Sequence, residues 1–361
     1  MRTAYILIAL FSCLGSCKKS RNYLKEISPV DSFLLKNYND ISETLNTFYA
    51  TDSTLITFNF RSNDLATYRL QNRNFERANI FHLPIAEKIQ SFNKLENNSY
   101  ILISDKNKHY ILDSNKILHP IFIKDTKRHL GTNFLNCGLQ YHPLIQIKNT
   151  LICTYYYQTL AQYSQYYLEP SLAEYTLNND SLHFQRSYFE KPKALINYRL
   201  PFAKYCWDGR ENIYLLYPPY DTLYVLNIDS KINNTVAINN LDYTKPKAYD
   251  IKEMLDNKNR SQEHSYMLNN FVYHSIYFNP ITSHLVIFYS TPYDAKDGQQ
   301  TLKALVLDKT FTVKGYFNFG SIPFFDTENF FLVPNKGIAM PIYDNNNNIK
   351  HEDIKYYIYN F

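Results

Sequence analysis

Two Tyr-His pairs are the first residues in this chain whose type and position could support chemistry. Tyr141-His142 stands in "LQYHPLIQI" and Tyr273-His274 in "FVYHSIYF", so each pair introduces an apolar, strand-like segment. Imidazoles at one site can bind a metal ion or transfer protons near neutral pH. No carboxylate follows at matching spacing, and a local hydrogen bond at the entrance of a strand explains each histidine better. We expect no metal and no cofactor.

The stretch "WDGRENIYLLYPPYDTLYVLN" begins with a polar cluster that contains three charged residues and a tryptophan: Trp207, Asp208, Arg210 and Glu211. Two carboxylates beside a guanidinium could act as an acid/base pair with a residue that orients a substrate. Asp-Gly is also a strong turn dipeptide, and a turn between two strands of a hairpin is the favoured interpretation. The catalytic residues, if the protein has any, are therefore unknown at this stage.

Tyrosines are concentrated in the stretch "CTYYYQTLAQYSQYYLEP". Rings that alternate along a strand cannot all be buried, so some should be exposed. Exposed tyrosines stack on sugars or contact partner proteins with little loss of entropy. Packing between sheets explains most of the others. The candidate contact residues are Tyr155, Tyr157, Tyr163 and Tyr166.

Several classes of site are absent from the sequence. There are only 8 glycines, and no phosphate-binding loop or dinucleotide fingerprint occurs. The nucleophile-elbow and zinc-protease motifs are also missing. Cys137, Cys153 and Cys206 fit no metal or disulfide spacing, and Cys153 reads as a small buried hydrophobe. A formal net charge of +5 does not indicate a nucleic-acid partner.

The elements that must position any site are β-strands. The chain has 34 Tyr and 24 Phe, and its apolar runs are rich in β-branched residues. One pattern recurs: a polar turn, an apolar strand, a polar loop and a second strand. It appears six times, at 52–72, 96–115, 148–179, 208–229, 280–309 and 327–361.

Strands such as "IYLLY", "YILIS" and "LVIFY" are apolar almost without interruption. This pattern is typical of sheets that are covered on both faces, which disfavours a β-sandwich with one wet face. With a further strand-like stretch on either side of each hairpin, the repeats predict a six-bladed β-propeller of four-stranded antiparallel blades. The polar stretch 245–270 is predicted to contain a helix between two blades.

The last unit ends at Phe361 after its third strand, whereas "NYLKEISPV" (22–30) has no partner near the start. We therefore predict that residues 22–30 supply the outer strand of the last blade and close the ring.

The N-terminus begins with Arg2 and a short apolar run, which ends in "LGSC" at Cys17. This resembles the lipobox of bacterial lipoproteins, in which the cysteine is acylated and becomes the mature N-terminus. An ordinary secretory signal is the alternative. The expected organisation is a signal peptide at 1–16, a lipid anchor with the closing strand at 17–30, and the propeller at 31–361.

The lipobox, the composition rich in Asn, Tyr and Lys, and the blade-like "DGRENIYLLY…TLYVLN" together resemble a known group. This group is the Bacteroides-type lipoproteins of unknown function with TolB-like six-bladed propellers, and the likeness spans nearly the whole chain. The resemblance implies an outer-membrane lipoprotein in the cell envelope. Basic residues follow Cys17, in place of the acidic run common in surface-displayed members, so a periplasm-facing anchor is favoured: Lys18, Lys19 and Arg21.

Three functions fit these expectations. The first is a binding module for a protein, peptide or glycan, attached to the membrane by its N-terminal lipid. The second is a carbohydrate hydrolase or lyase with its site at the mouth of the central channel. The third is a structural subunit of an envelope complex. The binding module is favoured, and the channel-mouth candidates are Tyr141, His142, Trp207, Asp208, Arg210, Tyr273 and His274.

Overall fold

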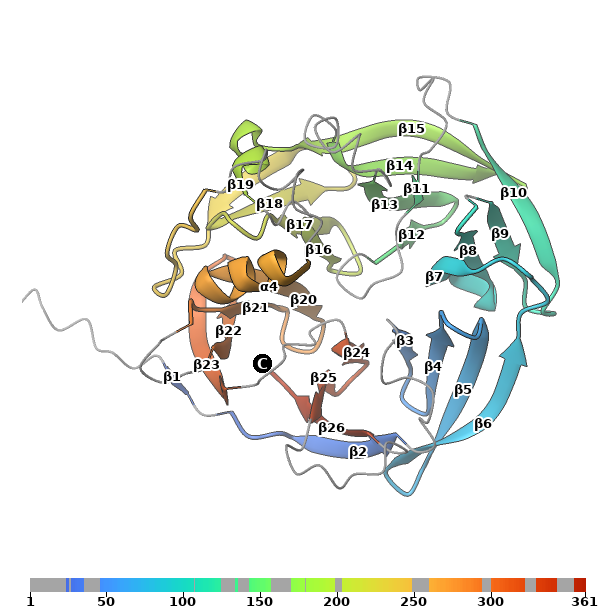
Figure 1. Ribbon diagram of the computed structural model, residues 1–361, viewed down its shortest axis with the longest axis horizontal. Coiled ribbons are helices and arrows are strands. Elements are labelled where there is room, and N and C mark those ends of the chain that lie inside the picture. The colour runs from blue at the N-terminus through green and yellow to red at the C-terminus, as the bar shows by residue number, and fades with distance from the viewer. Residues whose placement is uncertain are drawn as a thin grey trace, which may run out of the picture.

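The computed structural model describes most of the chain, and the described part is built almost entirely of strands (Figure 1). The described residues are 24–25, 27–35, 46–106, 108–124, 134–135, 143–156, 170–178, 180–198, 203–248, 260–293, 300–321, 329–342 and 354–361. The strands form twisted antiparallel sheets around a common centre, so the predicted all-β class is confirmed.

The strands group into units of four that pair side by side, and in all but the last unit the four follow one another in the chain. Sheet I consists of β3 (Asn46–Ala50), β4 (Thr54–Asn59), β5 (Asp64–Gln71) and β6 (Asn74–His82). Sheet II consists of β7 (Ile89–Lys94), the 3-10 turn η1 (Glu96–Asn98), β8 (Tyr100–Ser104), β9 (His109–Leu112) and β10 (Leu118–Lys124). Sheet III consists of β12 (Ile145–Ile147), β13 (Thr150–Tyr156), β14 (Pro170–Asn178) and β15 (Ser181–Glu190), with the short β11 (Phe134–Leu135) also on β13.

The second half of the chain repeats this arrangement. After the 3-10 helix η3 (Lys193–Asn197), sheet IV consists of β16 (Lys204–Trp207), β17 (Asn212–Leu216), β18 (Thr222–Asn227) and β19 (Asn233–Ala237). After the helix α4 (Arg260–Asn269), sheet V consists of β20 (Val272–Asn279), β21 (His284–Ser290), β22 (Thr301–Leu307) and β23 (Val313–Ser321). Sheet VI consists of β24 (Phe331–Val333), β25 (Gly337–Ile342), β26 (Ile354–Tyr359) and the early strand β2 (Asp31–Leu35). Within the described residues the strands thus form four-stranded groups of the kind that the repeats predict, and α4 lies inside the predicted helical stretch.

The sheets pack on both faces, which explains the uninterrupted apolar strands. In β17, Ile213 and Leu215 enter the core shared with sheets II and III. Their neighbours Tyr214 and Leu216 enter the core shared with sheet V. Successive side chains of a strand point to opposite faces, so a strand buried on both sides must be apolar at every position. The same holds around the whole ring, since sheets V and VI, VI and I, and I and II also share cores.

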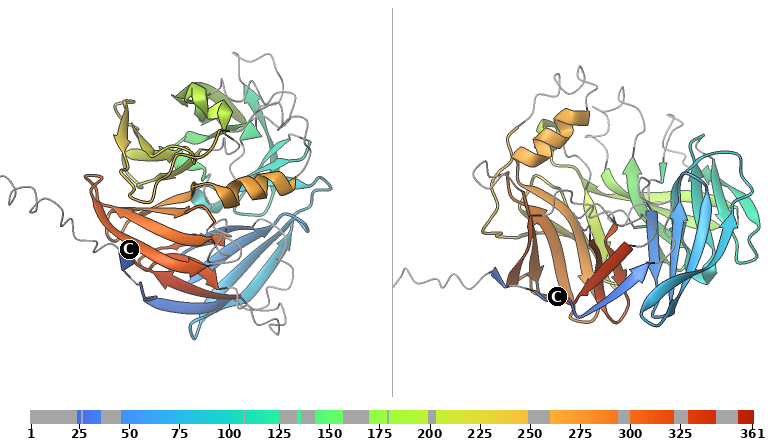
Figure 2. Two further views of the ribbon diagram at one scale, coloured as in Figure 1. Left: turned by 60° about the vertical axis from the view of Figure 1, so that its left-hand side comes forward. Right: turned by 60° about the horizontal axis from the view of Figure 1, so that its bottom comes forward.

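The ring has two faces with different loops (Figure 2). One face carries α4 and the 217–221 turn, where the Tyr243 hydroxyl donates to the Pro219 carbonyl at 2.9 Å. We call it the helix face. The other carries the turns between the first and second strands of the sheets, such as 208–211, and we call it the turn face.

An N-terminal strand closes the ring, but it is not the predicted segment 22–30. Strand β2 pairs antiparallel with β26 and parallel with β6, so it joins the last sheet to the first. Phe33 and Leu35 place their side chains in the shared core. Residues 27–30 are not a strand, since Pro29 lacks an amide hydrogen and no residue there supplies a comparable buried pair. The shorter β1 (Leu24–Lys25) pairs instead with β23 of sheet V.

The closing strand gives a prediction for stability. Phe33 is 5% exposed, stacks on Tyr356 at 5.1 Å between ring centroids, and meets Phe75 edge-on at 4.9 Å. Phe33→Ala should lower the free energy of unfolding by about 3–5 kcal/mol, because it removes apolar contacts and leaves a cavity. Urea unfolding monitored by fluorescence measures this loss. The control Ser32→Ala, on the same strand, should change stability by less than about 0.5 kcal/mol. Equal effects of the two substitutions would contradict a closing role for the buried face of β2.

Candidate functional site

The structure places Tyr273 and His274 at the start of the inner strand β20. A β-bulge interrupts the pairing between Tyr273 and Ser275, so His274 occupies the irregular position. Bulges often redirect a side chain. The His274 Nε2 lies 2.8 Å from the Ser290 hydroxyl. Burial, with a smaller effect of Lys204, lowers the pKa of His274 to about 3. The imidazole is therefore neutral at physiological pH and acts as a local hydrogen-bonding group.

Tyr273 belongs to a cluster of tyrosines and carboxylates on the helix face. Its hydroxyl donates to Asp221 at 2.6 Å, and the Tyr289 hydroxyl donates to Asp242 at 2.7 Å. Lys303 also reaches Asp242, at 2.9 Å. Burial raises the pKa of the Asp221 carboxyl above its usual value, although the bond from Tyr273 opposes this effect. Both carboxylates are thus engaged by buried phenols, which stabilise the junction of sheets IV and V.

Asp208 organises the turn between β16 and β17. Its Oδ1 accepts hydrogen bonds from the backbone amides of three following residues at 2.8–3.1 Å: Arg210, Glu211 and Asn212. Its Oδ2 accepts one from the Asn212 side chain at 3.0 Å. Gly209 adopts a φ of +77°, which glycine tolerates best. The residues therefore form the predicted turn, and Arg210 contacts Asp208 through its backbone amide.

Trp207 precedes this turn and packs against the core of sheets II to IV. Its indole Nε1 is buried and has no hydrogen-bond partner within the described part of the chain. A buried donor without an acceptor is unusual. Nothing among the described residues links this donor to a ligand.

The two sets of predicted channel-mouth residues lie at opposite ends of the inner strands. Cys206 pairs with Tyr214, whose ring stacks on Phe278 near the end of β20 at 6.3 Å between centroids. Tyr273 and His274 are at the beginning of that strand. The structure therefore puts Trp207, Asp208 and Arg210 toward the turn face, and the Tyr273-His274 pair toward the helix face.

The remaining predicted positions lie outside the described residues: Tyr141, His142, Tyr157, Tyr163, Tyr166, Cys17 and Cys137, together with the side chain of Tyr155. Cys153 is fully buried, as predicted, and its thiol faces the Ala173 carbonyl.

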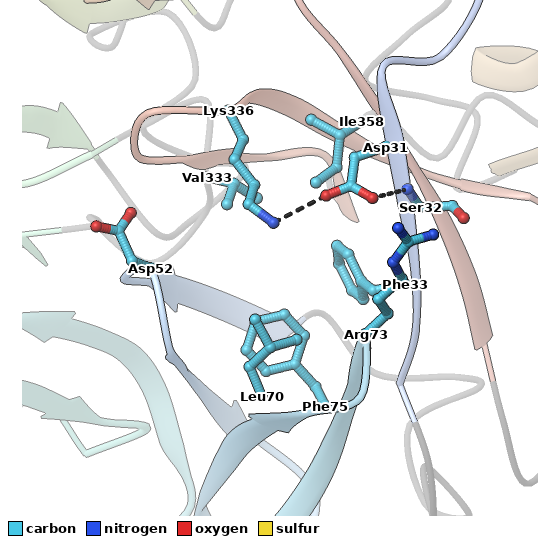
Figure 3. A pocket seen from close by; sticks show the side chains of 10 residues that line it. All are labelled: Asp31, Ser32, Phe33, Asp52, Leu70, Arg73, Phe75, Val333, Lys336 and Ile358. Carbon is cyan, nitrogen blue, oxygen red and sulfur yellow. Dashed lines mark hydrogen bonds and ion pairs between the residues drawn. The ribbon is translucent and has the colours of Figure 1, made fainter.

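A pocket that the sequence did not indicate lies where the closing strand meets sheets VI and I (Figure 3). We call it the seam pocket. Its floor is apolar: Phe33, Leu70, Phe75, Val333 and Ile358. Its rim is polar or charged: Asp31, Ser32, Asp52, Arg73 and Lys336. These rim residues come from β2 and from the 51–53, 72–73 and 334–336 turns, so the pocket opens on the turn face.

The charges on the rim differ in how far they are already paired. Lys336 Nζ donates to Asp31 Oδ2 at 2.8 Å. This bond, with a smaller effect of the Arg73 charge, lowers the pKa of Asp31. Asp52 accepts only a neutral amide, from Asn335 at 3.2 Å. Arg73 is exposed and donates no hydrogen bond to the described residues. The rim thus keeps a guanidinium, and opposite to it a carboxylate without a cationic partner, for a ligand.

Comparisons with known proteins support the fold. No family model matches the chain, and no curated protein matches it. Among solved structures, it is similar to a member of the DUF4221 family from Bacteroides vulgatus, with a TM-score of 0.62 and 12% identity, over 93% of this chain and 98% of the other. It is also similar to a candidate exported protein from Bacteroides fragilis, with a TM-score of 0.52 and 12% identity, over 94% and 99% of the chains.

At these identities the likeness concerns the fold alone, and it extends over almost the whole chain. The predicted resemblance to Bacteroides proteins of unknown function is supported to that extent.

Two further observations bear on chemistry and attachment. In the part of the chain that the structure describes, no three His, Cys, Asp or Glu side chains are grouped as metal ligands. No helix among the described residues combines the length and the apolar character that crossing a membrane requires.

The sequence missed the seam pocket because its parts come from five separate segments. The only local signal is the pair of left-handed residues Asn72 and Arg73, with φ of +49° and +66°, in the polar turn "QNRN". Such a turn is common at the end of a hairpin. Nothing in it indicates that Arg73 faces residues more than 250 positions away.

The turn at Asp208 can be tested separately from any binding role. Asp208→Ala should lower the free energy of unfolding by about 1–2 kcal/mol, because three amides lose their acceptor. Asp208→Asn keeps an oxygen at Oδ1 and should cost less. Arg210→Ala is the matched control, expected within about 0.5 kcal/mol of the unmodified protein. Thermal and urea unfolding measure all three, and an unchanged stability of Asp208→Ala would leave this carboxylate open to another role.

Proposed function

We propose that this protein is a binding module of the bacterial cell envelope, and that its seam pocket holds a segment of a partner polypeptide. One observation carries the proposal: an apolar floor lies beside Arg73, which has no hydrogen-bond partner among the described residues. Pockets that combine apolar area with a few polar groups are the usual form of a binding site.

The chemistry of the pocket favours a polypeptide with a carboxylate next to an apolar side chain. The apolar group would lie on the floor, and the carboxylate would bind the fork of donors on Arg73. Asp52 can accept a basic group from the same segment. The accessible part of the floor is the aliphatic side chain of Leu70, which is half-buried and suits an apolar side chain. A glycan fits less well, since Phe33 and Phe75 are almost wholly buried and offer no exposed ring face to a sugar.

The envelope location rests on the N-terminal sequence. The lipobox-like "LGSC" supports acylation of Cys17 after removal of residues 1–16. One diacylglyceryl group with an amide-linked chain would hold the propeller at the membrane surface. The basic residues that follow favour the periplasmic side of the outer membrane.

Site-specific photo-crosslinking in cells tests the seam pocket. A benzophenone amino acid at Leu70, on the pocket floor, should capture one envelope polypeptide. Arg73→Ala should reduce that capture roughly tenfold, which corresponds to about 1.4 kcal/mol for a charge-assisted contact. The control position is Ile281, which is 45% exposed and lies in a turn of sheet V. Equal capture from both positions, or capture at Leu70 that does not change in Arg73→Ala, refutes a role for the pocket.

Membrane attachment has an independent test. Cys17→Ser should abolish metabolic labelling with a fatty acid and move the protein from the membrane fraction to the soluble periplasmic fraction. Gly15→Ala, which keeps a small residue before the cysteine, should leave both unchanged. Retention of the Cys17→Ser protein in membranes would contradict lipid anchoring without bearing on the seam pocket.

A further inference from the structure

The outer strand of sheet IV, β19, has an unpaired edge. Within the described residues, each of the other outer strands has a second partner over two or three residues of its outer edge. β6 lies between β5 and β2, β10 pairs with β15, and β23 lies between β22 and β1. β19 pairs with β18 only. An unpaired edge presents free amides and carbonyls and is a template for adding another strand.

The hydrogen bonds around β19 show which groups point outward. The Ile232 carbonyl accepts from the Asn227 amide at 3.0 Å, and the Ile238 amide donates to the Asp221 carbonyl at 3.1 Å. Residues 232 and 238 thus face β18. In an antiparallel ladder the facing residues alternate, so 234 and 236 also face β18. The amides and carbonyls of Asn233, Thr235 and Ala237 therefore point to the open edge.

The strand lacks the features that usually protect an edge. Asn233–Ala237 contains no charged residue and no proline, and its register with β18 has no bulge. All of its residues are exposed except the half-buried Val236. Two large apolar side chains flank it: Ile232 is 56% exposed and Leu241 is 70% exposed. Burial of these two side chains by a pairing strand would be favourable.

We propose that β19 is a dimerisation edge, which pairs antiparallel with the β19 of a second copy of this chain. This role goes beyond the proposed function, because it does not involve the seam pocket. The outward groups are centred on Thr235. A two-fold axis there places Asn233 opposite Ala237 of the other copy and Thr235 opposite itself, so that every outward amide meets a carbonyl. The same axis places Ile232 opposite residue 238 of the second copy, three positions before that copy's Leu241.

The charges near the edge favour a second copy over a partner of another kind. An uncharged strand repels no identical strand and carries no charge pattern that would select a different chain. The nearest cation, Lys231, turns inward: its Nζ bonds Glu174 at 3.0 Å and lies 5.7 Å from the centre of the Tyr188 ring. In the two-fold arrangement Lys231 comes opposite Asn239, so no like charges meet.

The proposed contact is small. A five-residue strand pair with two apolar side chains at each end is below the usual size of a permanent interface. The dimer should therefore dissociate with a Kd of roughly 10–100 µM. Such an equilibrium is visible at the concentrations used in sedimentation.

Disulfide formation between introduced cysteines tests the axis. In a hydrogen-bonded antiparallel pair, the two Thr235 Cα atoms would lie about 5.5 Å apart, within disulfide range. Thr235→Cys in the full chain, purified in a mild detergent, should form a disulfide-linked dimer under mild oxidation. Asn234→Cys is the control, because its Cα atoms would lie roughly 8 Å apart across the same axis. The unmodified chain reports any dimer formed by its own cysteines.

Sedimentation of two further variants tests the hydrogen bonds. Thr235→Pro removes an outward amide without touching the ladder to β18, whereas Thr235→Val keeps this amide. The proline variant should sediment as a monomer, and the valine variant should dimerise like the unmodified chain, with equal thermal stability for both. Two results overturn the proposal: a monomer at about ten times the expected Kd, or disulfide formation at Asn234→Cys that equals that at Thr235→Cys. If a different protein occupies this edge, the purified chain gives one of these two results, and the proposal is likewise overturned.

Discussion

The double pairing of β2 is the interaction on which the rest of the structure depends. One edge of this strand joins β26, the last strand of the chain, and the other joins β6 of the first sheet. Without β2, sheets VI and I would each expose an edge and an apolar face, and the remaining blades would form an open arc. The Lys336–Asp31 bond and the stacked rings of Phe33 and Tyr356 lie at the same junction. Closure is therefore made by backbone pairing, apolar burial and one ion pair together.

The seam pocket is a consequence of this closure. Its floor and rim combine β2 with turns of sheets VI and I, and they come together only when the ends of the chain meet. Contacts between residues about 300 positions apart cost loop-closure entropy and form late in folding. A ligand that binds only the closed ring stabilises it by mass action. Binding in the seam pocket would thus also hold the ring shut, a coupling that a pocket within one blade would not have.

The fold could be predicted in large part because its strongest constraint is local. Ile213 to Leu216 must be apolar without a break, since alternate side chains enter different cores, and this is visible in one short stretch. The turn at Asp208 was also predictable, because Asp-Gly carries its own geometry. The closing strand was misplaced because "ISPV" and "SFLL" are similar short segments. The choice between them depends on a strand more than 300 residues away. The seam pocket could not be predicted for the same reason: its residues come together only when the ring closes, and they share no local sequence pattern.

The outer edges of the sheets are subject to the same constraint as the closure of the ring, because unpaired backbone groups at an edge need a partner strand or solvent. Blades covered on both faces still leave their outer strands to solvent, and this chain pairs strands from elsewhere in the sequence with two or three residues of several of these edges. Each of those added strands runs parallel to its partner and is supplied by the chain itself. Sheet IV follows a different course, because its outer strand is polar and uncharged, and no described segment pairs with it. Among the described outer strands, β19 is the one that has no second partner strand, and a second molecule can make the same kind of bond there. The seam pocket lies between sheets VI and I, whereas the β19 edge belongs to sheet IV. A ligand in the pocket and a second molecule at the edge would therefore not compete for the same surface.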